Sequence, residues 1–187
     1  MNDFFLANNE SLPHVFIDQK IEVKQIQVKN LEQFAGYANE IKNSLESYSI
    51  ETITPFIEPQ ILNIMGMCSM LTSLEPKVFA ANTAQTSAIA ELVLKIIQVN
   101  EAFLKKEKKQ QGSGKESTWF TVFAYLVKAG HRQDDIMNMT YGAFIQYLKE
   151  AQAIERQQIK SYALATRVAN NAKEKGWDKY LKQLDTL

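Results

Sequence analysis

Residues 87–106, SAIAELVLKIIQVNEAFLKK, show the clearest helical pattern in the chain and set the fold class that the sequence predicts. Their apolar residues recur at intervals of three and four, which places them on one face of an α-helix. That face consists of Ile89, Leu92, Val93, Ile96, Ile97, Phe103 and Leu104. The opposite face carries acid–base pairs four residues apart, a spacing that stabilises helices. We therefore expect one helix that buries its apolar face in a core.

Two more helices are expected before it. The first begins after Asn30 and carries an apolar stripe of Leu31, Phe34, Ala35, Ala38, Ile41 and Leu45. The second covers residues 61–71, ILNIMGMCSML, where Asn63 and Ser69 are the polar side chains. A helix that is apolar nearly all round needs cover on several sides.

Prolines mark the expected breaks between these helices. Pro55 and Pro59 interrupt the chain, and Pro59 suits the first turn of the helix that follows because its missing N–H is not needed there. Residues 73–86, which include Pro76, are expected to form a loop.

The strand-like pattern lies near the N-terminus. VFI at 15–17 and IEV at 21–23 alternate as strands do, with DQK at 18–20 as the candidate turn. The predicted fold is therefore mainly α, with a small N-terminal β-hairpin.

The stretch 105–120, KKEKKQQGSGKESTWF, has some features of a phosphate-binding loop but fails its requirements. Lys109 stands where the first glycine of a Walker A loop is needed, and Glu116 stands where a Ser or Thr should bind Mg²⁺. Ser113 and Glu116 instead fit the S-x-x-E pattern that starts helices. We expect a joint between two helical parts of the chain.

Helical patterns resume after this joint. Trp119, Val122, Phe123, Leu126 and Val127 form an apolar stripe. Gly130 suits the C-terminal cap of that helix, and Thr140 suits the N-cap of a long helix that ends near Gly176. The predicted organisation is an N-terminal hairpin and helical domain at 1–110, a linker and helix cap at 111–116, and a C-terminal helical domain at 117–187.

Composition narrows the function classes. Lys and Arg number 21, as do Asp and Glu, so the chain lacks the basic excess typical of nucleic-acid binders. Cys68 is the single cysteine, and His14 and His131 stand far apart, so no Cys/His metal site is expected. Neither a signal peptide nor a membrane span is recognisable, and a cytoplasmic location is expected. We find no acid–base pair that predicts an enzyme, and no cofactor site.

Two segments could be read as nucleic-acid-binding sites. The lysines of 105–109 are interrupted by Glu107 and have no interleaved aromatic residues for base stacking. Residues 125–150 could form a helix-turn-helix, but Asp134 and Asp135 would repel phosphates there. A small DNA-binding regulator is therefore the alternative and not the main hypothesis.

One cluster favours protein binding. Met65, Met67, Cys68 and Met70 lie within six residues, and methionine side chains adapt to varied apolar partners. Core packing explains each residue taken singly. The collective hypothesis is that one side of 61–71 packs inside and the other meets a partner helix.

The order of these features resembles that of bacteriophage tail assembly chaperones. The resemblance covers most of 15–165 and rests on three segments. They are KQIQVKNLEQFAGYANEI at 24–41, ELVLKIIQVNEAFLKK at 91–106 and TWFTVFAYLVKAGHRQDDIMNMTYGAFIQYLKEAQAIERQQ at 118–158. In that family a similar apolar helix ends in an Asn followed by an aromatic residue, here Asn100 and Phe103.

The resemblance implies a chaperone of phage or prophage tail morphogenesis that acts in the host cytoplasm without ATP, metal or cofactor. Its first part would bind the tape-measure protein, its second part would recruit tail-tube subunits, and it would be absent from the mature virion. Self-association stays open. The expected partner-binding residues are Met65, Met67, Met70, Asn100, Phe103, Trp119 and Tyr147.

Overall fold

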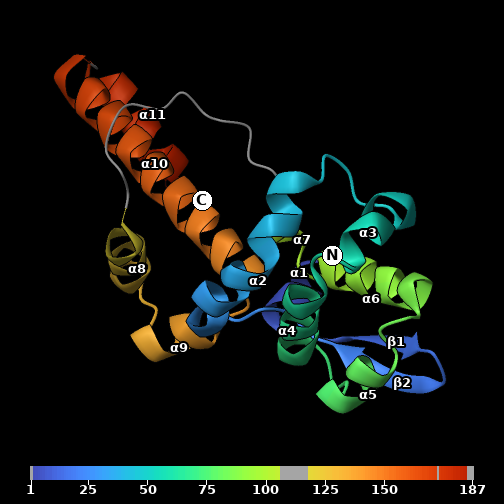
Figure 1. Ribbon diagram of the computed structural model, residues 1–187. Helices are drawn as coiled ribbons and strands as arrows, with labels where there is room; N and C mark the ends of the chain where they lie inside the picture. Colours follow the sequence, from blue (N-terminus) through green and yellow to red (C-terminus); the bar gives the residue numbers. More distant parts are fainter. Residues whose placement is uncertain (1, 106–117, 172, 185–187) are drawn as a thin grey trace. The chain divides into compact units, whose positions relative to one another are not determined.

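The computed structural model describes residues 2–105, 118–171 and 173–184 (Figure 1). Of these described residues, 72% lie in helices, and a two-stranded antiparallel hairpin lies near the N-terminus. The predicted mainly α fold with a small hairpin is confirmed. The chain divides into two compact units, unit 1 at Met1–Gln146 and unit 2 at Tyr147–Leu187.

The predicted domain boundaries remain a prediction. The linker at 111–116, with Ser113 and Glu116, lies outside the described residues. The division between the two compact units falls at a different place, inside the long helix α10 (Tyr141–Asn171). This is because the first turns of α10 pack with the N-terminal residues.

The hairpin pairs strand β1 (Leu12–Phe16) with β2 (Gln19–Val23), after the short helix α1 (Asp3–Ala7). Pairing extends to Phe16 and Gln19, so the turn consists of residues 17 and 18 and lies slightly before the predicted 18–20. Ile17 has a φ of 56°, a left-handed conformation that β-branched residues rarely adopt. Tight hairpin turns favour such positive φ values because they match the twist of the strands.

Unit 1 contains a series of short helices. They are η1 (Val28–Asn30, a 3-10 turn), α2 (Leu31–Ser44), α3 (Ile50–Ile57), α4 (Ile61–Leu71), α5 (Pro76–Ala81), α6 (Thr86–Val99), α7 (Glu101–Leu104), α8 (Trp119–Lys128) and α9 (Gln133–Asn138). The expected helices after Asn30 and over 61–71 are therefore confirmed as α2 and α4.

The prolines behave differently from the expectation. Pro55 lies inside α3, whose start is fixed by a reciprocal capping box between Ser49 and Thr52. Pro59 lies in the turn before α4 and not in its first turn. Pro76 is the first residue of α5, so the expected loop over 73–86 contains a helix, because proline fits position N1.

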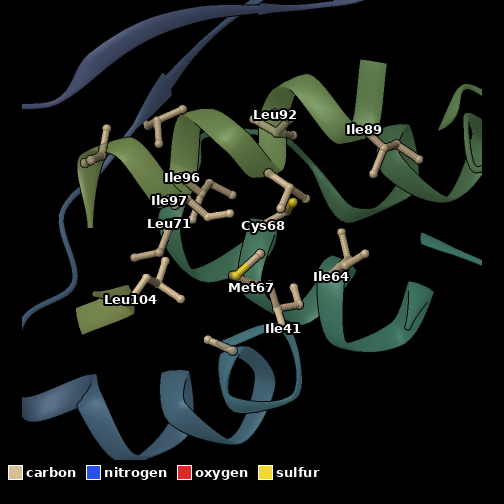
Figure 2. Close-up of a cluster of buried hydrophobic side chains, with 14 of the residues drawn as sticks. Ile41, Ile64, Met67, Cys68, Leu71, Ile89, Leu92, Ile96, Ile97 and Leu104 are labelled. Atoms are coloured by element: carbon tan, nitrogen blue, oxygen red, sulfur yellow. The ribbon is translucent and has the colours of Figure 1, made fainter. Parts of the chain in front are cut away.

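Helix α6 occupies the centre of the core. Figure 2 shows its apolar side chains meeting those of α4, with Ile41 of α2 close by. Each such burial contributes about 1.5–3 kcal/mol relative to exposure. The approach of α2 to α4 is close, since a Cβ added at Gly66 would lie 2.6 Å from the Tyr37 ring. The buried residues of the contact between α4 and α6 include Ile64, Met67, Cys68, Leu71, Ile89, Leu92, Ile96 and Ile97.

The helix predicted over 87–106 is interrupted at Asn100, where α6 ends and α7 begins. The Asn100 side chain is only 4% exposed. Its Oδ1 accepts a hydrogen bond from the Ile26 N–H at 2.7 Å, and its Nδ2 donates to the Lys24 carbonyl at 3.2 Å. The amide thus binds the extended chain after the hairpin as a neighbouring strand would.

The same extended chain binds residues just before α10. The Tyr141 N–H donates to the Ile26 carbonyl at 2.7 Å, and the Val28 N–H donates to the Met139 carbonyl at 3.0 Å. Thr140 Oγ1 donates to the Leu6 carbonyl and accepts from the Ala143 N–H, so Thr140 is the helix cap that the sequence predicts. The start of α10 therefore belongs to the core of unit 1.

Unit 2 consists of the rest of α10 and of α11 (Glu174–Leu184). Helix α10 ends at Asn171, and Gly176 lies inside α11, so the predicted helix end at Gly176 is wrong. Gly130 does follow α8 with a φ of 102°, as predicted for a C-terminal cap. None of the described side chains of unit 2 is fully buried.

We predict that Asn100→Ala lowers the free energy of unfolding of unit 1 by about 1–3 kcal/mol, because the buried Ile26 N–H loses its acceptor. The unfolding of unit 1 can be followed by the reaction of the Cys68 thiol with a thiol reagent across a urea gradient. Cys68 is the sole cysteine and is buried, so it reacts when unit 1 unfolds. Asn43→Ala, at an exposed position of α2, is the control and should change stability by less than about 0.5 kcal/mol. Equal effects of both substitutions would contradict this role of Asn100.

Candidate partner-binding surfaces

The methionine cluster of α4 divides between the core and the surface. Met67 is 1% exposed and lies in the cluster shown in Figure 2. Met65 and Met70 are half-buried at the edge of the core. Leu62 is 72% exposed on the side of the helix that Met65 borders. The outer apolar surface of α4, which we call the α4 edge, therefore consists of Leu62 and Met65.

Asn100 and Phe103 have contacts inside unit 1. Asn100 binds the extended chain after the hairpin, and Phe103 packs edge-to-face on Phe34 with a centroid distance of 5.0 Å. The Lys42 ammonium lies 4.7 Å from the centroid of the Phe103 ring and donates to the Phe103 carbonyl. In this conformation both predicted partner-binding residues stabilise the fold, and their role in binding remains a prediction.

A chain of aromatic contacts continues from Phe103 toward α8. Tyr141 lies 5.9 Å from Phe103 and 6.2 Å from Phe144, measured between ring centroids. Phe144 in turn lies 6.0 Å from both Trp119 and Phe123. Such pairs contribute about 0.5–1.5 kcal/mol each beyond their burial. The aromatic side of α8 is therefore held in place by the core.

The outer side of α8 is exposed and apolar. Phe120 is 82% exposed and Trp119 is 50% exposed, while Leu126 on the inner side is fully buried. Phe123 is half-buried, and Val127 is exposed. We call Trp119, Phe120, Phe123 and Val127 the α8 face. Its only charged neighbour within the helix is Lys128.

Sequence reasoning found Trp119 but missed Phe120. The predicted apolar stripe of this helix includes the buried Leu126 and does not include Phe120. The signal was present, because Phe120, Phe123 and Val127 are spaced by three and four residues on a second side of the same helix. Tyr147, another of the predicted partner-binding residues, is exposed and belongs to unit 2.

An open polar groove of about 450 Å³ lies beside the extended chain after the hairpin. Lys24 is the ionisable residue among those that line it, and the other side chains are amides, a hydroxyl and apolar groups. The lining contains no His, Asp, Glu or Cys, although His, Asp and Glu are common general acids and bases. The groove is lined by Asn9, Ser11, Lys24, Gln25, Ile26, Gln27, Asn30, Met70 and Leu71.

The structure also bears on the single cysteine, on metal-binding side chains and on membrane-spanning helices. Complete burial raises the pKa of the Cys68 thiol to about 12, which disfavours the reactive thiolate form. In the described part of the chain, no three His, Cys, Asp or Glu side chains gather to hold a metal ion. Among the helices of residues 2–105, 118–171 and 173–184, none has the length and apolar character of a membrane span.

Comparisons with protein-family models, with curated proteins and with solved structures find no match to this chain.

His14 contains a buried polar atom without a partner. It lies on β1 opposite Ile21, and its Nε2 atom has no hydrogen bond among the described residues. Burial lowers the pKa of the imidazole, and the nearby Lys95 ammonium lowers it further, while Glu91 raises it. The folded state therefore disfavours the protonated imidazole.

This depressed pKa predicts a pH dependence of stability. The unfolded chain protonates His14 near its ordinary pKa of 6.5, above the folded-state value. Above that pH the neutral imidazole does not reduce the free energy of unfolding. As the pH falls from there through the folded-state pKa, the free energy of unfolding decreases, because the unfolded state then binds more protons. Urea unfolding of the wild type and of His14→Gln should show a larger acid-induced loss of stability in the wild type. Identical losses would contradict the assignment.

Proposed function

We propose that the chain is a tail assembly chaperone of a phage or prophage, acting in the host cytoplasm. It binds the tape-measure protein, helps to recruit tail-tube subunits, and leaves before the virion is complete. The sequence resemblance supports this proposal, and the α8 face is the structural observation that carries it.

The α8 face has the properties of a protein-binding surface. Phe120 and Trp119 expose large aromatic side chains on a helix with one charged residue. Aromatic residues are enriched in the energetically dominant parts of interfaces. Trp119 and Phe123 also contact Phe144, and Leu126 is buried, so the helix is already held in place and binding would not require its ordering. Following the family's division of roles, we assign the α8 face to the tail-tube subunit.

The α4 edge is assigned to the tape-measure protein. Its Leu62 side chain is exposed, and Met65 beside it is half-buried and flexible. A tape-measure protein is a long, apolar-rich helical chain, and an amphipathic helix of it would meet this edge by helix packing. The core beneath the edge, including Met67 and Cys68, provides a rigid support.

The regulator hypothesis has less structural support. The first turn of α9 presents Asp134 and Asp135 to solvent, where they would repel phosphate groups. Ala143 and Phe144, in the first turn of α10, are buried. A recognition helix reads bases with its N-terminal residues, and those of α10 are occupied by packing in unit 1.

We predict that Phe120→Glu abolishes capture of the tail-tube subunit by the tagged full-length chain, while Leu62→Glu abolishes capture of a tape-measure fragment. A buried charge in either interface costs several kcal/mol, enough for at least about a hundredfold loss of affinity. Co-expression followed by affinity purification measures both interactions in parallel.

Phe4→Glu provides the matched control, since Phe4 is a 77% exposed phenylalanine of α1 outside both surfaces. It should leave both interactions intact. Failure of the wild type to retain either protein would refute the chaperone proposal, and salt-sensitive binding to duplex DNA would favour the regulator. If each partner is captured but neither substitution affects it, the function stands and the assigned surfaces are wrong.

A further inference from the structure

Unit 2 carries a line of positive charge along α10 that the proposed function does not use. Its members are Lys149, Arg156, Lys160 and Arg167, which we call the basic stripe, and all four are exposed. At 100° per residue they fall within about 40° of one another around the helix axis. At 1.5 Å per residue, the stripe extends for about 27 Å.

The charges of the stripe are not compensated within the helix. No Asp or Glu stands three or four residues before or after any of the four cations. Arg156 and Lys160 are four residues apart, a like-charge spacing that weakens a helix. The acids of α10, Glu150 and Glu155, lie about 100–120° away around the axis. A solvated helix gains from acid–base pairs at these spacings, so their complete absence needs another explanation.

The surroundings of the stripe distinguish between anionic partners. Ile159 and Leu164 flank it on either side and are exposed, and Ala153 and Ala163 lie between the cations. Tyr162 lies between Lys160 and Arg167 in the sequence but about 120–160° away around the helix axis, so the stripe itself has no aromatic ring on which the bases of a single-stranded nucleic acid could stack. A phosphate backbone also offers nothing to exposed aliphatic side chains. A protein helix with acidic and apolar residues on one face can pair with the cations and also cover the exposed aliphatic side chains.

We propose that the basic stripe binds an amphipathic partner helix whose acidic side chains repeat at intervals of seven, four and seven residues. This spacing mirrors that of the cations, so four ion pairs form while apolar side chains of the partner cover Ile159 and Leu164. Unit 2 as a whole has eight Lys or Arg and five Asp or Glu, which adds long-range attraction to such a partner. The inference stands independently of the α8 face and the α4 edge.

The test uses the full-length chain and two designed helical peptides of equal composition. One peptide places four Glu at spacings of seven, four and seven beside Leu and Ala, and the other scatters the same Glu around the helix. Fluorescence anisotropy at low salt should show roughly tenfold tighter binding of the first peptide, with the preference weakened in about 0.5 M salt.

Two variants with the same net charge separate the stripe from general attraction. Lys149→Gln, Arg156→Gln, Lys160→Gln and Arg167→Gln together should abolish the preference between the peptides, and glutamine keeps the helix propensity of the cations. The control replaces Lys173, Lys175, Lys179 and Lys182 of the same unit by Gln and should retain the preference. Circular dichroism of both variants checks that α10 is still helical.

Three outcomes would overturn the proposal. The first is equal binding of the two peptides to the wild type, and the second is an equal loss of preference in both variants, which would indicate net charge alone. The third is that a DNA or RNA oligonucleotide binds more tightly than either peptide and depends on the stripe. That result would assign the surface to a nucleic acid.

Discussion

The amide side chain of Asn100 is the contact on which the arrangement of unit 1 depends. It binds the backbone of Lys24 and Ile26, and so holds the chain that leaves the hairpin against the end of α6. In the same extended chain, the Ile26 carbonyl accepts a hydrogen bond from the Tyr141 N–H, and the Val28 N–H donates to the Met139 carbonyl. One short segment, 24–28, therefore connects the hairpin, the central helix and the start of α10. A buried amide is required there because each backbone group removed from water needs a partner.

The sequence predicted the elements with a regular apolar period and missed those set by tertiary contacts. Helices α2 and α6 have clear apolar stripes, α4 is apolar nearly all round, and the hairpin has clear alternation. The break at Asn100 has no local signal, because its cause is a strand-like segment more than seventy residues earlier. Pro55 was read as a break because proline removes a backbone hydrogen bond within a helix, but α3 is held by tertiary packing, with Ile53 and Ile57 buried in the core.

The candidate surfaces were predictable to a smaller extent. The apolar character of α4 and α8 was visible, but which side of each helix faces solvent depends on the packing of its neighbours. Met67 turned inward and Phe120 outward for this reason. The two units carry different kinds of surface. Apolar and aromatic side chains mark α4 and α8 in unit 1, and uncompensated charge marks α10 in unit 2.

The docking of residues 139–141 has a further consequence, because these contacts depend on geometry and not on chain continuity. A chain that lacks residues 118–187 would leave the carbonyls of Leu6 and Ile26 and the N–H of Val28 without these partners. Residues 139–141 of another molecule can satisfy the same groups, as in the exchange of identical segments between protomers.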